Sequence, residues 1–160
     1  MAKNTRKYWL MKSEPDVYSI DDLAREGRVH WDGVRNYQAR NFMRDQMKID
    51  DLVLFYHSNA KPPGIAGLAT VASEPYADPT QFDPKSDYHD PKSTKDNPRW
   101  ILVDIAFVEK LPALVPLDAL KADPALEEML VTQRGSRLSV QPVEHKHFTH
   151  VLKMAGAAPR

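Results

Sequence analysis

The residues of this sequence best suited to chemistry are one aromatic side chain and a series of basic ones that follows it. Trp31 ends the short run 28–31, and a glycine follows two positions later. A basic side chain then recurs at every fourth position, in Arg40, Arg44 and Lys48. An aromatic ring can stack on a nucleic-acid base, which gains about 1–3 kcal/mol, and basic side chains can contact phosphates. The pattern indicates a nucleic-acid site, although a core Trp and a solvated basic helix face would look the same.

Polar side chains also follow the ends of two apolar runs. Ser13 and Glu14 end the first run, and His57 and Ser58 end the run 52–56. Polar side chains at strand ends gather at pockets more often than they fill cores, so both pairs are candidates for the same site.

A segment late in the chain is rich in hydrogen-bond donors. Around Gly135, the segment 134–141 contains two arginines, two serines and a glutamine. These side chains can read a base edge or bind a phosphate, and they would equally suit a surface loop that caps the last helices.

Catalytic chemistry has weaker support. His57 and Ser58 have the residue types of a base and a nucleophile, but adjacent residues of a strand point to opposite faces. The Gly-x-Ser-x-Gly turn of hydrolases and the glycine motifs that bind nucleotide phosphates and dinucleotides are all absent. We therefore expect no enzyme; the alternative is a small hydrolase or RNA-processing enzyme that uses His57 with Glu14. A third possibility is a protein-interaction module that uses the segment 79–91.

Two groups of metal-ligating residue types lack a recognised ligand spacing. They are Asp83, Asp87, His89 and Asp90 in one segment, and His145, His147 and His150 in another. The sequence has no cysteine, which excludes disulfides, thiolate metal sites and cysteine nucleophiles. We expect neither a metal nor a cofactor.

Composition bounds the class of protein. The 160 residues suit a single domain, 1–160, that is large enough for a real core. Lys and Arg total 22, as do Asp and Glu, so a protein that coats DNA by bulk charge is disfavoured while a local basic patch is allowed. No apolar run is long enough for a membrane span or a signal peptide. We expect a monomer in the cytoplasm, or in the nucleus of a eukaryote.

The elements that must position these residues follow from short-range patterns. Strands are expected at 8–12, 28–31, 52–56, 64–71 and 100–108. Helices are expected from a cap at Ser19 to a stop at Gly27, and at 37–47, 117–121, 124–132 and 143–155. Two loops are expected, 134–142 and the proline-rich 74–99, which is too long for a mere connection and is either functional or mobile. Strands interleaved unevenly with helices predict an α+β domain with a curled mixed sheet.

Four blocks of the sequence resemble the signature blocks of the EVE domain family. They are WLMKSEP at 9–15, WDGVRNYQARN at 31–41, DLVLFYHS at 51–58 and GSRLSVQP at 135–142. The resemblance spans about 8–152 and implies the PUA-like fold, a mixed β-barrel of five to six strands flanked by helices, related to the YTH readers of N6-methyladenosine. It also implies a pocket for a flipped-out modified base, with modified cytosines in DNA (5-methylcytosine, 5-hydroxymethylcytosine) as the best candidates. A base presented in this way is read by stacking and by hydrogen bonds to its edge.

The resemblance assigns roles to individual residues. Lys12 and Ser13 match the pair that closes the first strand beside the base in YTH domains, and Trp31 matches the first aromatic of their cage. The implied base-binding set is Lys12, Ser13, Trp31, Asn36, Tyr56, His57, Ser58 and Ser139. The expected phosphate-binding set is Arg35, Arg40, Arg44 and Arg137.

The sequence departs from the YTH pattern at the second wall of the cage. No Trp lies between Ser58 and Arg99, so that wall has no matching residue. Tyr76, Phe82 or Tyr88 could replace it, or the pocket could be open on that side. The overall prediction is a non-enzymatic reader of nucleic acid that carries modified bases.

Overall fold

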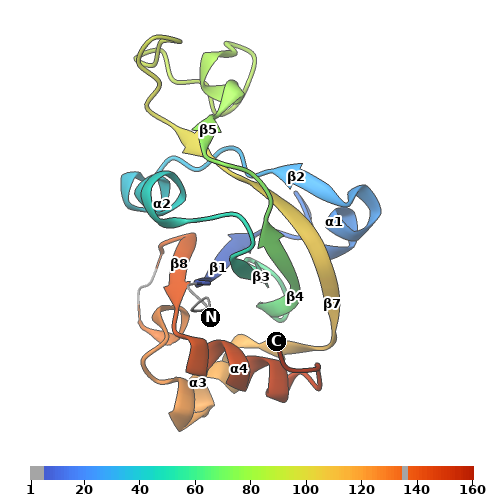
Figure 1. Cartoon of the computed structure of the whole chain (residues 1–160). Coiled ribbons are helices and arrows are strands. Elements are labelled where there is room, and N and C mark those ends of the chain that lie inside the picture. The colour runs from blue at the N-terminus through green and yellow to red at the C-terminus, as the bar shows by residue number, and fades with distance from the viewer. Residues whose placement is uncertain (1–5, 135–136) are drawn as a thin grey trace, which may run out of the picture.

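The computed structural model describes residues 6–134 and 137–160, and short helices surround a curled sheet (Figure 1). The strands are β1 (Tyr8–Ser13), β2 (Arg28–His30), β3 (Leu52–His57), β4 (Gly64–Val71), β5 (Tyr76–Ala77), β6 (Ile101–Leu102), β7 (Asp104–Pro116) and β8 (Val140–Val143). The α-helices are α1 (Ile20–Glu26), α2 (Tyr37–Asn41), α3 (Leu117–Ala122) and α4 (His145–Met154). The shorter turns are the π-helical η1 (Phe42–Gln46) and the 3₁₀ turns η2 (Pro79–Phe82), η3 (Pro124–Leu126) and η4 (Leu130–Thr132).

Six of the described strands form one mixed sheet in the order β2-β7-β4-β3-β1-β8. β1 and β3 run parallel, and the other neighbouring pairs in this sheet are antiparallel. β3 lies near the middle and is buried along its first five residues, as its apolar sequence predicts. The sheet curls into a half-barrel, which confirms the predicted α+β class with a curled mixed sheet (Figure 1).

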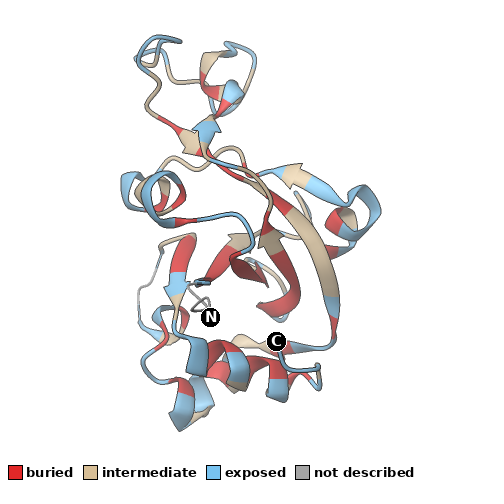
Figure 2. Ribbon diagram, in the orientation of Figure 1, coloured by how far each residue is buried: buried red, intermediate tan, exposed pale blue. Residues whose placement is uncertain are grey.

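The pleat of the strands divides the core into two clusters, one on each face of the sheet. In β1, Tyr8 and Leu10 join one cluster, while Trp9 and Met11 join the other. β3 alternates in the same way, because successive side chains of a strand point to opposite faces. α3 and α4 cover the first cluster, and α1, α2 and η1 cover the second (Figures 1 and 2).

α1 begins and ends where the sequence predicts. The Ser19 hydroxyl accepts from the Asp22 amide at 3.1 Å, and the Asp22 carboxylate accepts from the Ser19 amide at 2.8 Å, which together form a capping box. The helix ends at Gly27, whose φ of 80° suits glycine. The cap fixes the buried Ile20 and Leu23 against the second cluster.

The segment predicted as one helix at 37–47 is an α-helical turn followed by a π-helical one. The Asn36 side chain caps α2 by accepting from the Ala39 amide at 2.9 Å. In η1, the Met47 amide donates to the Phe42 carbonyl five residues earlier. The turn ends at Gln46 with Met47 as its C-cap, so Lys48 lies beyond the helix and the predicted basic series does not continue along it.

β7 continues past Pro112, so the predicted strand end near residue 108 was wrong. The ladder partners jump from Gly67 opposite Lys110 to Ile65 opposite Val115, which leaves 111–114 as an irregularity. A proline is tolerated there because no ladder bond needs its missing amide hydrogen.

Two further predictions at the end of the chain were wrong. β8 begins inside the predicted loop 134–142 and ends at Val143, and Pro142 fits because β8 is an edge strand. The predicted helix at 124–132 is instead the two 3₁₀ turns η3 and η4, since the intervening Met129 has an extended ψ of 136°.

The proline-rich segment 74–99 has a framework of its own and extends from β5 away from the sheet (Figure 1). The fully buried Gln81 side chain donates to the main-chain oxygens of Asp78 at 2.7 Å and Trp100 at 2.8 Å. Its oxygen accepts from the Trp100 amide at 3.0 Å. The Trp100 indole donates to Asp90 at 2.7 Å, and these bonds join the two ends of the segment.

Candidate nucleic-acid interface

A cavity of about 730 Å³ opens where β1 ends, and we call it the main cavity. Its walls come from the ends of β1 and β3, from β2 and the turn after it, from residues 137 and 139, and from Tyr88 of the proline-rich segment. Its volume lies within the range of about 300–1,000 Å³ that is usual for sites of small ligands.

The parallel pairing of β1 and β3 brings polar strand ends to this place. Ser13 lies opposite His57 in the register, and the Ser58 amide donates to the Ser13 carbonyl at 2.9 Å. On the other side of β1, the Lys12 amide donates to the Ser139 carbonyl at 2.9 Å. Three segments that are far apart in sequence therefore present serines to one cavity.

Trp31 is both a core residue and part of the cavity wall. Only 8% of its surface is exposed, and its ring meets Phe55 edge to face at a centroid distance of 5.6 Å. Its amide donates to the Val103 carbonyl at 3.0 Å, which continues the pairing of β2 with β7. The two interpretations of Trp31 offered by the sequence are therefore compatible: the core holds the ring, and a small part of it faces the main cavity.

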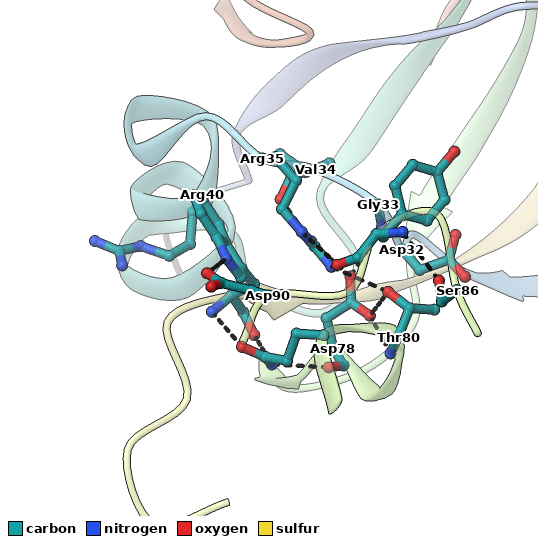
Figure 3. Close-up of polar contacts among 12 residues, drawn as sticks. Asp32, Gly33, Val34, Arg35, Arg40, Asp78, Thr80, Ser86 and Asp90 are labelled. Carbon is teal, nitrogen blue, oxygen red and sulfur yellow. Dashed lines mark hydrogen bonds and ion pairs between the residues drawn. The ribbon is translucent and has the colours of Figure 1, made fainter. Parts of the chain in front are cut away.

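Gly33 lets the turn after Trp31 approach the proline-rich segment. Its φ is 80°, and a Cβ built at this position would lie 2.7 Å from the Tyr88 ring. Its amide donates to the Asp78 carboxylate at 2.8 Å (Figure 3). The turn and Tyr88 thus form one continuous wall of the main cavity.

Arg35 holds this wall together. Its guanidinium donates to the carboxylate of Asp78 at 3.1 Å, to the hydroxyl of Thr80 at 3.1 Å and to the carbonyl of Val34 at 2.9 Å (Figure 3). Its Nε and Nη2 also donate to the Tyr88 carbonyl at 3.1 and 2.6 Å. These five bonds occupy the five N–H groups of the side chain. Arg35 lines the main cavity, but its donors are already used.

Asp32 is one of the two described acidic residues that line the main cavity, and the other is Glu14. The Asp32 carboxylate lies 3.4 Å from the His30 Nε2, and side chains of both line the cavity. Burial raises the pKa of Asp32, the nearby charge of Asp78 raises it further, and His30 and Arg35 oppose both effects. A half-buried carboxylate of this kind is suited to accept hydrogen bonds from a ligand.

The structure brings together seven of the twelve residues assigned to the site from sequence. Around the main cavity lie Lys12, Ser13, Trp31, Arg35, Ser58, Arg137 and Ser139. Glu14, named in the alternative enzyme hypothesis, lines it as well. Tyr88, one of the three candidates for a second aromatic wall, also lies there.

The structure places Asn36, Tyr56 and His57 outside the lining of this cavity. Tyr56 points to the opposite face of β3 and packs in the first cluster. The His57 Nε2 accepts from the Ile20 amide at 3.1 Å, and burial lowers the pKa of His57. Asn36 caps α2 instead. His57 and Glu14 are therefore not assembled as a catalytic pair, since Glu14 faces the cavity and accepts from Asn59 at 2.7 Å.

Arg40 and Arg44 also lie outside this lining. The Arg40 guanidinium lies 4.7 Å from the Tyr37 ring centroid and donates to the Arg99 carbonyl at 2.8 Å. Arg44 makes two bonds to its neighbour Asp45 at 2.8 and 2.9 Å. Both side chains are engaged on the outer side of α2 and η1.

Sequence reasoning missed six side chains that line the cavity: Val17, Tyr18, Val29, His30, Asp32 and Val34. Asp32 carried a usable signal, because it directly follows Trp31 within the block that suggested the site. Within the described residues, no cluster of three or more metal-ligating side chains occurs. No helix in the described ranges is long and apolar enough to cross a membrane.

The half-barrel and the cavity at the end of its parallel strand pair define a PUA-like domain. The chain belongs to the EVE domain family, whose model matches residues 7–154. Mouse thymocyte nuclear protein 1 is 41% identical over an alignment of 178 residues, gaps included, which covers 99% of this chain and 77% of the mouse protein. The predicted family and fold are confirmed.

Two solved structures resemble this chain in fold. One is the human THYN1 protein in complex with DNA that contains 5-methylcytosine; it is 42% identical with a TM-score of 0.88, and covers 96% of this chain and 99% of that chain. The other is the YTH domain of Zygosaccharomyces rouxii MRB1 with N6-methyladenosine RNA, at 11% identity and a TM-score of 0.53, covering 100% of this chain and 92% of that chain. The second likeness concerns the fold alone.

Proposed function

We propose that this protein binds DNA and holds a modified cytosine, flipped out of its strand, in the main cavity. The observation that carries the proposal is the likeness to the human protein in complex with 5-methylcytosine DNA, and a cavity of suitable size beside Trp31 supports it. Extraction of a base costs a few kcal/mol, which stacking and edge contacts in the cavity must offset.

The chemistry of the cavity walls suits a cytosine. The cytosine N4 amino group is a donor, and a carboxylate is its usual acceptor in proteins, so we assign it to Asp32. Ser58 and Ser139 can donate to the base carbonyl or accept from its edge. The Ser13 hydroxyl donates to the Tyr18 carbonyl at 2.5 Å, so only its oxygen remains for the base. Trp31 and Tyr88 supply aromatic surface for the ring.

The apolar part of the cavity suits a methyl group on the base. Val17, Val29 and Val34 line it beside the two aromatic residues. Burial of one methyl group gains about 0.8 kcal/mol, or roughly fourfold in affinity, which sets the expected preference for 5-methylcytosine over cytosine.

The backbone of the DNA meets the rim of the cavity. Arg137 is exposed and lines the cavity, so we assign it to a phosphate. Six residues expected from sequence are not assigned to DNA contacts, because their side chains lie elsewhere or are already bonded within the protein. They are Asn36, Tyr56, His57, Arg35, Arg40 and Arg44. We propose that a monomer binds the DNA, without catalysis.

A binding measurement tests the proposal. Fluorescence anisotropy with oligonucleotides that differ only at one central cytosine, 5-methylcytosine or 5-hydroxymethylcytosine should show tighter binding to a modified base at two salt concentrations. Equal affinity for all three would contradict it.

A pair of tyrosine variants locates the binding site. Tyr88 and Tyr37 are both exposed, at 39% and 51%, but only Tyr88 lines the main cavity. Tyr88→Ala should weaken binding to modified DNA by about 1–3 kcal/mol, the usual range for a base-stacking side chain, while Tyr37→Ala should not. Trp31→Ala is less suitable, since truncation of a buried Trp costs about 3–5 kcal/mol of stability by itself.

A further inference from the structure

A second cavity of about 570 Å³ lies on the other side of the β1 end. The sheet contributes Lys12 and Tyr56 to it, and α3 contributes Leu117 and Lys121. Arg134 and the residues just before it complete the lining. Its walls therefore come from the face of the sheet that α3 covers, opposite the face of Trp31.

The charge in the second cavity is of one sign. Lys12, Lys121 and Arg134 line it, and no acidic residue does. Within the described residues, Lys121 and Arg134 make no ion pair, whereas Arg44 on the outer face is paired with a carboxylate. Lys121 and Arg134, which lie in one hollow and have no carboxylate partner among the described residues, favour an anionic ligand.

Thr132 and Gln133 in this lining already have partners within the protein. The Thr132 hydroxyl donates to the Met129 carbonyl at 2.7 Å, and the Gln133 amide donates to the Glu127 carbonyl. Tyr56 is only 3% exposed, so it offers almost no ring surface for stacking. Phosphate, recognised by charge, therefore suits the second cavity better than a second base.

The two cavities share a wall. Lys12 lines both of them, which is possible because it stands at the end of β1, between the two faces of the sheet. The next residue in β1, Ser13, lines only the main cavity, and the residue paired with Lys12, Tyr56, lines only the second. A strand whose base enters the main cavity beside Lys12 can therefore reach the second cavity with its sugar–phosphate chain.

We propose that the second cavity binds backbone phosphate of the same strand whose modified base occupies the main cavity, with Lys121 and Arg134 as the phosphate-binding residues. The inference rests on the proposed function. Lys12 stands between the two sites, and its ammonium lies 5.8 Å from the Tyr56 ring centroid. Phosphate contacts set position and affinity but do not read sequence. The second cavity therefore adds affinity for any DNA, while the main cavity supplies the preference.

The test measures affinity against salt for a Lys121→Gln/Arg134→Gln variant, with oligonucleotides that carry one central cytosine or 5-methylcytosine. The slope of log affinity against log salt is negative. Loss of two phosphate contacts should reduce its magnitude by about 1.4 for single strands and about 1.8 for duplexes. Both oligonucleotides should weaken by the same factor, so their affinity ratio should stay as in the wild type.

Lys153→Gln is the matched control. Lys153 and Lys121 both lie in the last turn of a helix, but Lys153 lines neither cavity. Its loss should leave the slope as in the wild type. If the double variant keeps the wild-type slope while the wild type still prefers the modified base, the second cavity is not a phosphate site and the proposed function stands. If the wild-type protein shows no preference for the modified base, both the proposed function and this inference are wrong.

Discussion

Asp32 and Arg35 belong to the same turn, yet they lie in two polar regions of opposite character. Arg35, Asp78 and Gln81 form a framework whose donors and acceptors are matched within the protein. Asp32 and Ser139, on the cavity side, have few partners or none among the described residues. Complete hydrogen bonding identifies the framework, and incomplete hydrogen bonding identifies the groups that remain available to a ligand.

This difference has an energetic basis. A matched buried polar group contributes a modest net stability, but removal of one partner leaves the other desolvated and costs more. A half-buried group without a partner already carries that cost, and a ligand can relieve it. Framework variants should therefore change stability first, whereas variants of the cavity groups should change binding first.

The largest effect is expected for Arg35→Ala. The change removes five hydrogen bonds and leaves Asp78, only 1% exposed, without its cation. Loss of one partner of a buried ion pair costs about 3–5 kcal/mol, and since Arg35 is partly exposed we expect about 3 kcal/mol. Chemical denaturation measures this. Arg44→Ala breaks an exposed ion pair and should leave stability almost unchanged. If both variants lose the same stability, the framework bonds of Arg35 are not special.

Gly33→Ala should come next, because the glycine joins the framework to the cavity wall. A side chain at φ 80° costs about 1–2 kcal/mol, and the new Cβ would also lie 2.7 Å from the Tyr88 ring. Both stability and DNA affinity should fall. Thermal unfolding measures the stability, and fluorescence anisotropy measures the DNA affinity.

Gly27→Ala is the matched control for that variant. Gly27 has the same φ of 80°, but a Cβ there would meet nothing within 4 Å. It should lose stability by strain alone and keep its DNA affinity. If the two variants bind DNA equally well, the contact of Gly33 with Tyr88 does not shape the cavity.

Much of this fold could be predicted from sequence, because its strands and first cap depend on local patterns. Ser19, Asp22 and Gly27 are close neighbours, so their roles follow from spacing alone. The role of Asp78 depends on bonds to Gly33 and Arg35, more than forty positions away, and no local pattern contains that information.

The candidate site was harder to predict than the fold. The resemblance marked the block that contains Tyr56 and His57 but not the direction of each side chain. The pleat sends Tyr56 to the opposite face, and a bond to Ile20 holds His57 beneath α1. The contacts of each side chain, which no motif records, decide which members of a signature block line the cavity.

Asp32→Asn should weaken binding while leaving the fold intact. If the carboxylate accepts from a cytosine amino group, loss of its charge should cost about 1.5 kcal/mol, or roughly tenfold in affinity. Stability at neutral pH should stay the same or rise, because burial and Asp78 disfavour the ionised form. Asp96→Asn, at an exposed position, serves as the control.

The raised pKa of Asp32 also predicts a pH dependence. Below that pKa the carboxylate is protonated, so wild-type binding to modified DNA should weaken on acidification, starting at a higher pH than for an ordinary aspartate. Between the unfolded and folded pKa values the native state binds more protons, so the wild type should gain stability relative to Asp32→Asn as the pH falls through this window. Wild-type affinity that does not change on acidification would contradict the first statement. A difference in stability between the two proteins that stays constant across acidic pH would contradict the second.

The smallest effects are expected for two serines that line the same cavity, one with a hydroxyl that is bonded within the protein and one without such a bond in the part of the chain that the structure describes. The Ser13 hydroxyl donates to the Tyr18 carbonyl, whereas the described residues offer the Ser139 hydroxyl no partner. Ser13→Ala should therefore lose about 1 kcal/mol of stability, and Ser139→Ala less than about 0.5 kcal/mol. Ser139→Ala should instead lose about 1 kcal/mol of binding to modified DNA, or roughly fivefold. Denaturation and anisotropy on the two variants separate these effects, and if Ser139→Ala changes stability but not affinity, an unmatched hydroxyl does not identify a ligand contact in this cavity.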